Sequence, residues 1–476
     1  MMDEFLRDIN CHVFYHWVYL QLCDEYMIKE EWYKNDLTLI METETTRSEI
    51  TFYEQNIIEF KIINLLNQEI IFYLHFQMNS FAHAVELFDE MKDSMSEASA
   101  KSALKILLCC SGGMTSGFFS TQLQAASDSQ NLRFKIDSAS YQRLYQLGQD
   151  YDIILLAPQI SYAYSQVKNI LNDKIIIKIP PKIFAKYDAL SMLDMILKTE
   201  RNKRTEKVPE ALKISKHVND GILCLAIIRN SIRTHVFYRY YENNQIVIEN
   251  EVIKNTLDIQ DLYDIIDTIS VRYAKLKIIG VSTPGIINQG ILTSFRIKGL
   301  ENKNVISLLK ERYHKEVIFS NDVNCAALGF YEAFPIYKSL SFLFQPIHAY
   351  SGIGSIINGQ LVTGRKNIAG ESQFLPMDLS DNFIQLSTSP EGTLEVVAKT
   401  LLSTISIISP DVLVVVCQMI PDVSVLRAEL EKLIDKQYIP EIVKVVDMQK
   451  YIHFGILNQC VEALQAKDKY ILNPKR

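Results

Sequence analysis

Cys110 stands where a strand-like run meets a loop of mostly small residues. Residues 105–110 read Lys-Ile-Leu-Leu-Cys-Cys, and the loop that follows consists of Ser111, Gly112, Gly113, Met114, Thr115, Ser116 and Gly117. Small residues leave backbone N–H groups able to surround one sulfur, and a helix starting near Thr115 would direct its N-terminal dipole at the same place. A thiolate, or a phosphoryl group carried on it, would be stabilised there. We therefore predict that Cys110 is the chemical centre of the protein.

Three interpretations of Cys110 have to be weighed. A buried thiol can simply pack as a small hydrophobe, which we expect of its neighbour Cys109. A tyrosine-phosphatase loop needs an arginine six positions after the cysteine, but residue 116 is a serine. A phosphocysteine carrier must hold phosphate and then release it, which amides and hydroxyls without a guanidinium clamp would permit. The residues favour the carrier.

Strands and helices alternate around this loop. Strands are predicted at residues 103–109, 134–138, 152–157 and 175–179, and helices at 118–127, 140–147, 162–171 and 189–197. Apolar strands that alternate with helices form a parallel sheet covered on both faces. The loop after the first strand would then lie at the carboxyl edge, where such sheets bind ligands.

Composition limits the class of protein. The chain has 476 residues, of which 48% are hydrophobic, a net charge of −7, and eight cysteines without a Cys-x-x-Cys pair. The charge does not favour nucleic acid or an anionic membrane as a partner, and the cysteines are typical of reduced thiols. The acidic start of the chain does not resemble a signal peptide. We expect a cytoplasmic protein.

Two polar stretches, at residues 92–101 and 198–209, are predicted to be linkers. They divide the chain into modules at 1–95, 101–200 and 215–476. The first module holds 18 acidic and 6 basic residues, which argues against direct binding of nucleic acid. With strands predicted at 49–53, 57–63 and 69–76 and a helix at 81–91, it is interpreted as a small α+β interaction or dimerisation module.

The middle module resembles the IIB component of the lactose/cellobiose class of the sugar phosphotransferase system. Residues 110–117 read Cys-Ser-Gly-Gly-Met-Thr-Ser-Gly, against a family loop of the type Cys-Ser-Ala-Gly-Met-Ser-Thr-Ser. Residues 155–162 read Leu-Leu-Ala-Pro-Gln-Ile-Ser-Tyr, against Leu-Leu-Gly-Pro-Gln-Val-x-Tyr. The resemblance covers the module and implies a phosphatase-loop-like α/β fold with a four-stranded parallel sheet.

The same resemblance implies a function. Cys110 would accept a phosphoryl group from a IIA phosphohistidine and pass it to a sugar held by a membrane IIC permease. Residues 111–117 would form the cradle for the phosphate, which Gly117 would weaken because it lacks the family's hydroxyl. Gln159 and Tyr162 would shape the neighbouring wall.

The third module resembles the ROK family of sugar kinases and repressors, which has the actin-like ATPase fold. Its Pro-Gly turn corresponds to residues 280–285, and its Glu-Asn-Asp-Ala-Asn segment to Ser-Asn-Asp-Val-Asn at 320–324. Its glycine-rich hairpin corresponds to Ser-Gly-Ile-Gly at 351–354, followed by further glycines and Glu371. The resemblance makes Asn321, Asp322 and Glu371 candidate sugar-binding residues, with Asp322 at the place of the catalytic base.

Several family features are missing from this module. The phosphate loop, Asp-x-Gly-Gly-Thr, should fall near residues 226–233, which contain neither that aspartate nor the glycines. The histidine and cysteines of the family's zinc site are also absent, so we expect no metal and no cofactor. Asp322 is then either a surviving sugar-binding carboxylate or an N-cap of the helix that follows. We predict a pseudokinase that binds a sugar or sugar phosphate.

Three functions remain open from the sequence. The first is a IIB phosphocarrier. The second is a regulatory protein that uses the IIB and ROK-like domains as sensors of phosphorylation and of sugar. The third is a ROK sugar kinase, which the altered phosphate loop disfavours. The sequence leaves formation of a homodimer open.

Overall fold

The computed structural model describes residues 2–21, 26–33, 36–43, 45–65, 68–100, 104–112, 114–130, 132, 134–172, 174–200, 220–230, 233–294 and 296–472. Gly113, residues 201–209 of the second predicted linker and the start of the third module lie outside these residues, as do the side chains of Met114 and Thr115. In the described part of the chain, no helix is long and apolar enough to cross a bilayer.

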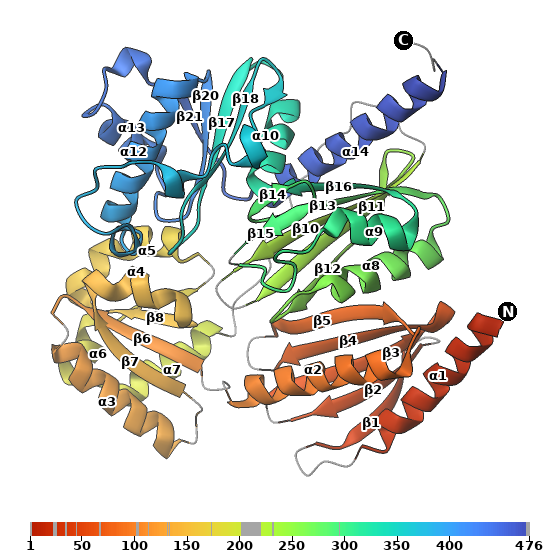
Figure 1. Ribbon diagram of the computed structural model, residues 1–476. Helices are drawn as coiled ribbons and strands as arrows, with labels where there is room; N and C mark the ends of the chain where they lie inside the picture. The colour runs from red at the N-terminus through yellow and green to blue at the C-terminus, as the bar shows by residue number, and fades with distance from the viewer. Residues whose placement is uncertain are drawn as a thin grey trace.

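The N-terminal part is an antiparallel sheet covered on one face by two helices (Figure 1). Its three predicted strands are confirmed, and one helix and two strands come in addition. The elements are α1 (Met2–Tyr19), β1 (Ile28–Tyr33), β2 (Asp36–Glu42), β3 (Thr46–Tyr53), β4 (Ile57–Asn64), β5 (Ile70–Gln77) and α2 (Phe81–Ala100).

The linker predicted at residues 92–101 is wrong, because α2 continues to Ala100. Met91 and Met95 are buried against the sheet and Ala98 packs on the same core. These positions extend the apolar stripe of the helix by two further turns, although the residues between them are polar. The segment is thus a continuation of the helix, in which Ser94 is buried and Ser96 is exposed.

The N-terminal sheet is continuous with the sheet of the third module. Strand β5 pairs antiparallel with β12 (Gln245–Lys254), with Tyr73 opposite Ile253. The result is a sheet of ten strands in the order β1-β2-β3-β4-β5-β12-β11-β10-β13-β16. Helices α1, α2 and α8 (Ile259–Arg272) lie on one face and share one hydrophobic core, which contains Phe14, Phe88 and Ile265. Because β5 and β12 pair with each other, neither is left as an unpaired strand at the edge of a sheet.

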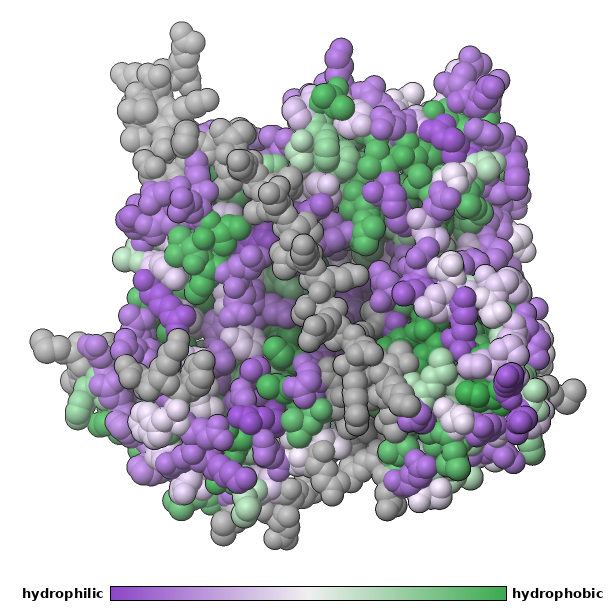
Figure 2. Space-filling model, turned by 180° about the vertical axis from the view of Figure 1, so that it is seen from behind, coloured by the Kyte–Doolittle hydropathy of each residue, from purple (hydrophilic) through white to green (hydrophobic). Residues whose placement is uncertain are grey.

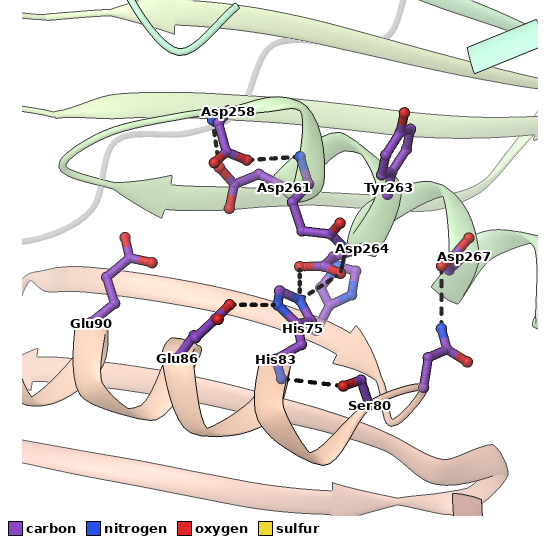
Figure 3. A network of polar contacts seen from close by, with 12 residues as sticks. His75, Ser80, His83, Glu86, Glu90, Asp258, Asp261, Tyr263, Asp264 and Asp267 are labelled. Carbon is purple, nitrogen blue, oxygen red and sulfur yellow. Dashed lines mark hydrogen bonds and ion pairs between the residues drawn. The ribbon is translucent and has the colours of Figure 1, made fainter. Parts of the chain in front are cut away.

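A network of polar contacts joins α2 to α8 (Figure 3). The Nε2 of His83 lies 3.0 Å from Oδ2 of Asp264, and His75 lies between Thr268 and Tyr238, with Nε2 2.6 Å from the tyrosine hydroxyl. Lys254 binds Asp261 and Glu90. The two parts of the chain therefore meet through satisfied polar groups as well as through apolar packing.

The middle module has the predicted four-stranded parallel sheet, in the order β7-β6-β8-β9. Strands and helices were predicted within a few residues of their observed bounds, and one short helix, α6, comes in addition. The elements are β6 (Leu104–Cys110), α3 (Met114–Ser129), β7 (Phe134–Ser140), α4 (Leu144–Leu147), β8 (Ile153–Leu156), the 3₁₀ helix η4 (Pro158–Ala163), α5 (Tyr164–Ile170), β9 (Ile175–Lys178), α6 (Pro181–Lys186) and α7 (Ala189–Glu200).

The third module consists of two lobes with the same strand order. When the five strands of each lobe are numbered in chain order, they lie side by side in the order 3-2-1-4-5. These orders are β12-β11-β10-β13-β16 and β19-β18-β17-β20-β21. In each, the first three strands are antiparallel and the last two run parallel to the first. This duplication is the actin-like fold that the sequence predicted.

The first lobe contains β10 (Gly221–Arg229), β11 (Thr234–Glu242), β12, α8, β13 (Leu276–Thr283), β14 (Ile286–Asn288), β15 (Ile291–Thr293), α9 (Val305–Tyr313), β16 (Glu316–Asn321) and α10 (Asp322–Ala333). The second contains β17 (Ser339–Gln345), β18 (Gly352–Ile357), β19 (Gln360–Leu361), α11 (Phe383–Leu386), α12 (Pro390–Ile408), β20 (Val412–Cys417), α13 (Val423–Leu430), β21 (Glu441–Lys444) and α14 (Gln449–Leu472). Helices α10 and α14 pack between the two sheets.

The middle module packs on the second lobe. A single hydrophobic cluster contains residues of both, including Leu171 of the middle module and Leu426 of α13. Asn172 accepts a hydrogen bond of 3.5 Å from Gln418, directly after β20. The N-terminal part and the middle module therefore both contact the two-lobed third module (Figure 1).

Candidate functional site

Cys110 lies at the carboxyl end of the central strand β6. This strand is buried between β7 and β8 because Ile106, Leu107 and Leu108 face the covering helices on both sides. Cys110 is 4% exposed, and its thiol donates a hydrogen bond of 3.1 Å to the hydroxyl of Ser116. The cysteine is thus placed at the edge of the sheet by the strand and oriented by a residue of the next helix.

The loop after Cys110 ends in the N-terminus of helix α3, which begins at Met114. Ser111 and Gly112 are exposed, whereas Ser116 is fully buried behind the sulfur. The first N–H groups of a helix are not used within it, and the helix dipole favours negative charge at that end. Charge placed on the Cys110 sulfur therefore meets a favourable environment.

Gly117 lies in α3 on the side that faces strand β7. A Cβ atom at this position would lie 3.7 Å from the hydroxyl oxygen of Ser138, which is ordinary van der Waals contact. A hydroxyl at position 117 would begin next to β7. That Gly117 weakens the phosphate cradle stays a prediction.

Gln159 and Tyr162 belong to η4, directly after β8, which is the neighbour of β6. Both side chains are exposed, Tyr162 to 78%. The Tyr162 ring lies 6.5 Å from the ring of Tyr141, which follows β7. The two predicted residues therefore lie at the carboxyl edge of the sheet, with exposed side chains.

Two aromatic residues at this end of the sheet were missed from the sequence. The rings of Phe118 and Tyr187 meet edge to face with centroids 5.0 Å apart, and Phe118 is 54% exposed. Tyr187 has a left-handed backbone conformation at the end of α6. Tyr187 ends the segment 179–187, which resembles the IIB family's Ile-x-x-x-x-Tyr element, but neither ring was predicted to lie at the site. The position of Phe118 depends on how α3 and α6 meet.

Cys109 behaves as a structural thiol. It is fully buried, and burial raises its pKa to about 12, with a further contribution from the neighbouring Cys110. A thiol with so high a pKa is a poor nucleophile at neutral pH. Cys109 is therefore a suitable negative control for experiments on Cys110.

The three candidate residues of the ROK-like part lie where its two lobes meet. Asn321 caps helix α10, since its side chain accepts a hydrogen bond of 3.0 Å from the N–H of Asn324. It also donates one of 3.0 Å to the carbonyl of Gly285. Our suggestion that Asp322 is the N-cap is wrong, because Asp322 is the first residue inside the helix.

Asp322 is buried beside this cap. Burial raises its pKa to about 6, although the N–H of Val323 and the guanidinium of Arg296 favour the ionised form. Burial also raises the pKa of Glu371, and the negative charge of Asp322 raises it further. The structure thus brings Asp322 and Glu371 together and adds Arg296, which sequence reasoning missed.

Two glycines fix the backbone of this site. Gly285 has φ +119° and Gly370 has φ +89°, conformations that favour glycine. A Cβ atom at Gly370 would lie 1.8 Å from the carbonyl oxygen of Ile353. Gly370 lets the chain approach β18 closely, so that Glu371 bridges to Gly352.

The turn between β10 and β11 stands where a phosphate loop was expected. Ala226 is buried within β10, and Arg229 ends that strand. The guanidinium of Arg229 donates hydrogen bonds to the hydroxyl of Thr234 and to the carbonyl of Asn255. An arginine side chain therefore stands in the region where the family resemblance places the glycine-containing phosphate loop.

Comparison with known families identifies two domains. Residues 105–194 match the family model for the PTS system lactose/cellobiose-specific IIB subunit. Residues 239–392 match the model for the ROK family. The chain contains a lactose/cellobiose IIB domain followed by a ROK family domain, as the sequence motifs predicted.

Two curated relatives each match about a quarter of this chain. An N-acetyl-D-glucosamine kinase of Histophilus somni (strain 129Pt) is 30% identical over 116 residues, which are 22% of this chain and 36% of that protein. An N-acetyl-D-glucosamine kinase of Haemophilus influenzae (strain 86-028NP) is 26% identical over 121 residues, 25% of this chain and 39% of that protein. The chain spans little more than a third of the length of these relatives.

Among solved structures, a ROK family protein from Streptococcus pneumoniae TIGR4 in complex with sucrose is 17% identical, with a TM-score of 0.42. The match covers 52% of this chain and 99% of that chain. A ROK hexokinase from Thermus thermophilus is 14% identical with a TM-score of 0.41, and its match covers 52% of this chain and 99% of that chain.

Proposed function

We propose that this protein accepts a phosphoryl group on Cys110 from a IIA phosphohistidine and transfers it to a sugar at a IIC permease. In the first step the Cys110 thiolate attacks phosphorus, a P–S bond forms, and the P–N bond to histidine breaks. In the second step a sugar hydroxyl attacks the phosphorus, a P–O bond forms, the P–S bond breaks, and the departing sulfur takes up the hydroxyl proton to restore the thiol. Both steps would take place on the cytoplasmic side of the membrane.

The single observation that supports this proposal is the position of Cys110. Its sulfur lies at the carboxyl edge of a parallel sheet, next to a helix N-terminus and within 3.1 Å of the Ser116 hydroxyl. Such surroundings stabilise the three charged oxygens of a phosphoryl group. The exposed surface of Gln159 and Tyr162 on the neighbouring loop gives a donor protein room to approach.

The test is phosphoryl transfer from labelled phosphoenolpyruvate through enzyme I, HPr and a lactose/cellobiose-class IIA protein. We expect label on the full-length protein and on Cys109→Ser, and none on Cys110→Ser. Mass spectrometry of the labelled protein should locate the phosphate on Cys110. Label that survives Cys110→Ser, or no label with several IIA donors, would refute the proposal.

A regulatory role is the second candidate, because of how the ROK domain has changed. Residues 226–233 lack the expected aspartate and glycines, while Asn321, Asp322 and Glu371 remain. Such a domain would bind a sugar ligand without using ATP, and phosphorylation of Cys110 would report transport to it. ATP-dependent phosphorylation of N-acetylglucosamine or glucose by the full chain would instead make it a kinase.

A further inference from the structure

Strand β1 is the open end of the ten-stranded sheet. In the part of the chain that the structure describes, it pairs with β2 on one side and is the last strand on the other. Figure 1 shows it at the rim of the N-terminal part, away from β5, which joins the ROK domain. An end strand presents backbone N–H and C=O groups to any chain that can add a further strand. This open side of β1, the β1 edge, is therefore a place where a partner can bind.

Exposed apolar and aromatic side chains accompany the β1 edge. Trp32 is 68% exposed, and Met27, directly before the strand, is 75% exposed. Helix α1 ends over the same strand, because Tyr15 donates a hydrogen bond to Glu30 and its ring stacks on that of Tyr19 with centroids 6.2 Å apart. Tyr19 is also exposed. Since aromatic residues and methionine are enriched at protein interfaces, this composition favours a protein partner.

The charges beside the β1 edge are unbalanced on the face of the sheet away from the helices. Arg47 forms ion pairs of 3.5, 3.4 and 2.9 Å with three carboxylates, those of Glu31, Glu42 and Glu49. The one further cation of this network is Lys61, which also binds Glu49. Seen from behind, at the lower left of Figure 2, the N-terminal part carries many hydrophilic side chains. Three carboxylates thus share two cations, and a third cation next to Glu31 would balance the network.

Lys29 is a cation of β1 that is available to a second copy of the chain. It lies on the same face of the sheet as Glu31, because alternate residues of a strand share a face. Its side chain is exposed and forms no ion pair with the residues that the structure describes. Opposite charges directly across a pair of strands stabilise the pairing. A second copy that places its Lys29 opposite Glu31 would therefore supply the third cation.

The pleat of β1 restricts how two copies can pair. A two-fold axis perpendicular to the sheet pairs the strands antiparallel, and each residue must meet one from the same face. With Glu30 on the axis, Lys29 lies opposite Glu31 of the second copy, and Ile28 lies opposite Trp32. Glu30 then meets Glu30 of the second copy, but each is hydrogen-bonded within its own chain. With Lys29 or Glu31 on the axis instead, no opposite charges face each other, so one register of β1 is complementary to itself.

We propose that this protein forms a homodimer in which β1 pairs antiparallel with β1 of a second copy, with Glu30 on the two-fold axis. The pairing joins two ten-stranded sheets edge to edge and covers both β1 edges. This surface lies outside residues 105–194 and 239–392, which match known families. It gives the N-terminal part, interpreted from its sequence as an interaction or dimerisation module, a defined contact. The proposal does not depend on the phosphocarrier role of Cys110.

Sedimentation velocity of the full-length protein over a range of micromolar concentrations tests the proposal. We expect wild type to dimerise, and Lys29→Glu and Glu31→Lys each to weaken dimerisation at least tenfold, because like charges then face each other twice. An equimolar mixture of the two variants should restore the dimer, which two misfolded proteins would not do. Lys277→Glu, the same change at an exposed position of β13, is the control and should dimerise as wild type does. A monomeric wild type, unchanged dimerisation of Lys29→Glu, or a mixture that stays monomeric would refute the pairing.

Tryptophan fluorescence gives a second measurement of the same contact. The chain has two tryptophans, and Trp17 already packs within the N-terminal part, with its ring 5.3 Å from that of Phe88. Dimerisation should bury Trp32 against Ile28 of the second copy and shift its emission to shorter wavelength as the protein concentration rises. The shift should be absent from Trp32→Phe. A dimer that forms without this shift, or a shift that persists in Trp32→Phe, would place the contact elsewhere and overturn the proposal.

Discussion

The thiol of Cys110 donates a hydrogen bond of 3.1 Å to the hydroxyl of Ser116, six positions along the chain. A phosphatase loop would have an arginine at that position, and its guanidinium would stabilise the transition state of hydrolysis. A buried hydroxyl orients the sulfur and can donate to a thiolate without adding positive charge. This pairing suits a site that keeps its phosphoryl group until a partner removes it.

The first prediction concerns Ser116. Ser116→Ala should slow phosphorylation of Cys110 by about tenfold, because loss of one hydrogen bond to a charged group is worth roughly 1.5 kcal/mol. The rate is measured by quenched labelling with a IIA donor. Ser120→Ala is the control, since Ser120 lies one turn further along α3 and its hydroxyl donates to the Gly117 carbonyl. Equal rates in both variants would show that Ser116 does not support the sulfur.

The second prediction concerns His83, which joins the N-terminal part to the ROK domain. Burial alone would lower its pKa, but Asp264 and Glu86 outweigh this effect and the pKa lies above the ordinary value. The protonated form is therefore favoured in the folded state. Its contribution is full below about pH 6.5, the ordinary pKa of histidine, and is lost as the pH rises through the raised value.

Urea unfolding of wild type and His83→Gln at pH 6.0 and 8.5 checks this. We expect the variant to be less stable by roughly 1 kcal/mol at pH 6.0 and by less at pH 8.5. His12→Gln, an exposed histidine on α1, should change the stability little at either pH. A difference between wild type and His83→Gln that grows with pH would contradict the assignment.

The third prediction concerns Gly370, which precedes Glu371. Gly370→Ala should destabilise the protein by more than about 2 kcal/mol, because the left-handed backbone is strained and the new Cβ would meet the Ile353 carbonyl. Gly359→Ala is the matched control: its φ is +78°, but its nearest neighbour is the Tyr331 hydroxyl at 3.2 Å. Thermal unfolding should show a clearly larger loss for Gly370→Ala. Equal losses would mean that the close approach to β18 is unimportant.

Much of the IIB domain could be predicted because its signals are local. Residues 110–117 combine a strand end, a small-residue loop and a helix start. The buried strands of the sheet are predicted from their short runs of apolar residues. The structure has this loop at the predicted edge of the predicted sheet. The pairing of β5 with β12 could not be predicted. The paired residues are 180 positions apart in the sequence, and neither strand carries a local pattern that indicates its partner.

The ROK site shows the same limit. The glycines and the Asn-Asp pair follow motifs that a sequence displays, whereas Arg296 lies in a loop without a motif. Its position near Asp322, whose charge raises its pKa against the effect of burial, depends on tertiary packing that no local pattern displays. The N-cap was misassigned by one residue because asparagine and aspartate are both good caps and stand side by side.

The last prediction concerns the stability cost of ionised Asp322. Its pKa in the folded state is about 6, raised by burial above the ordinary value near 3.8. The folded protein therefore binds a proton more tightly at this site than the unfolded chain does. It follows that the contribution of Asp322 to stability decreases as the pH rises from about 4 to about 6 and is constant above.

Asp322→Asn removes this titration. Compared with wild type, the variant should gain about 2 kcal/mol in free energy of unfolding between pH 4.5 and 7.5, because about 1.5 pH units separate pH 4.5 from the folded-state pKa and each unit corresponds to about 1.4 kcal/mol. Asp378→Asn, a change at an exposed carboxylate, should change the free energy of unfolding by the same amount at both pH values. If Asp322→Asn is instead less stable than wild type at pH 7.5, the ionised carboxylate stabilises the fold through Arg296. That result would contradict the prediction.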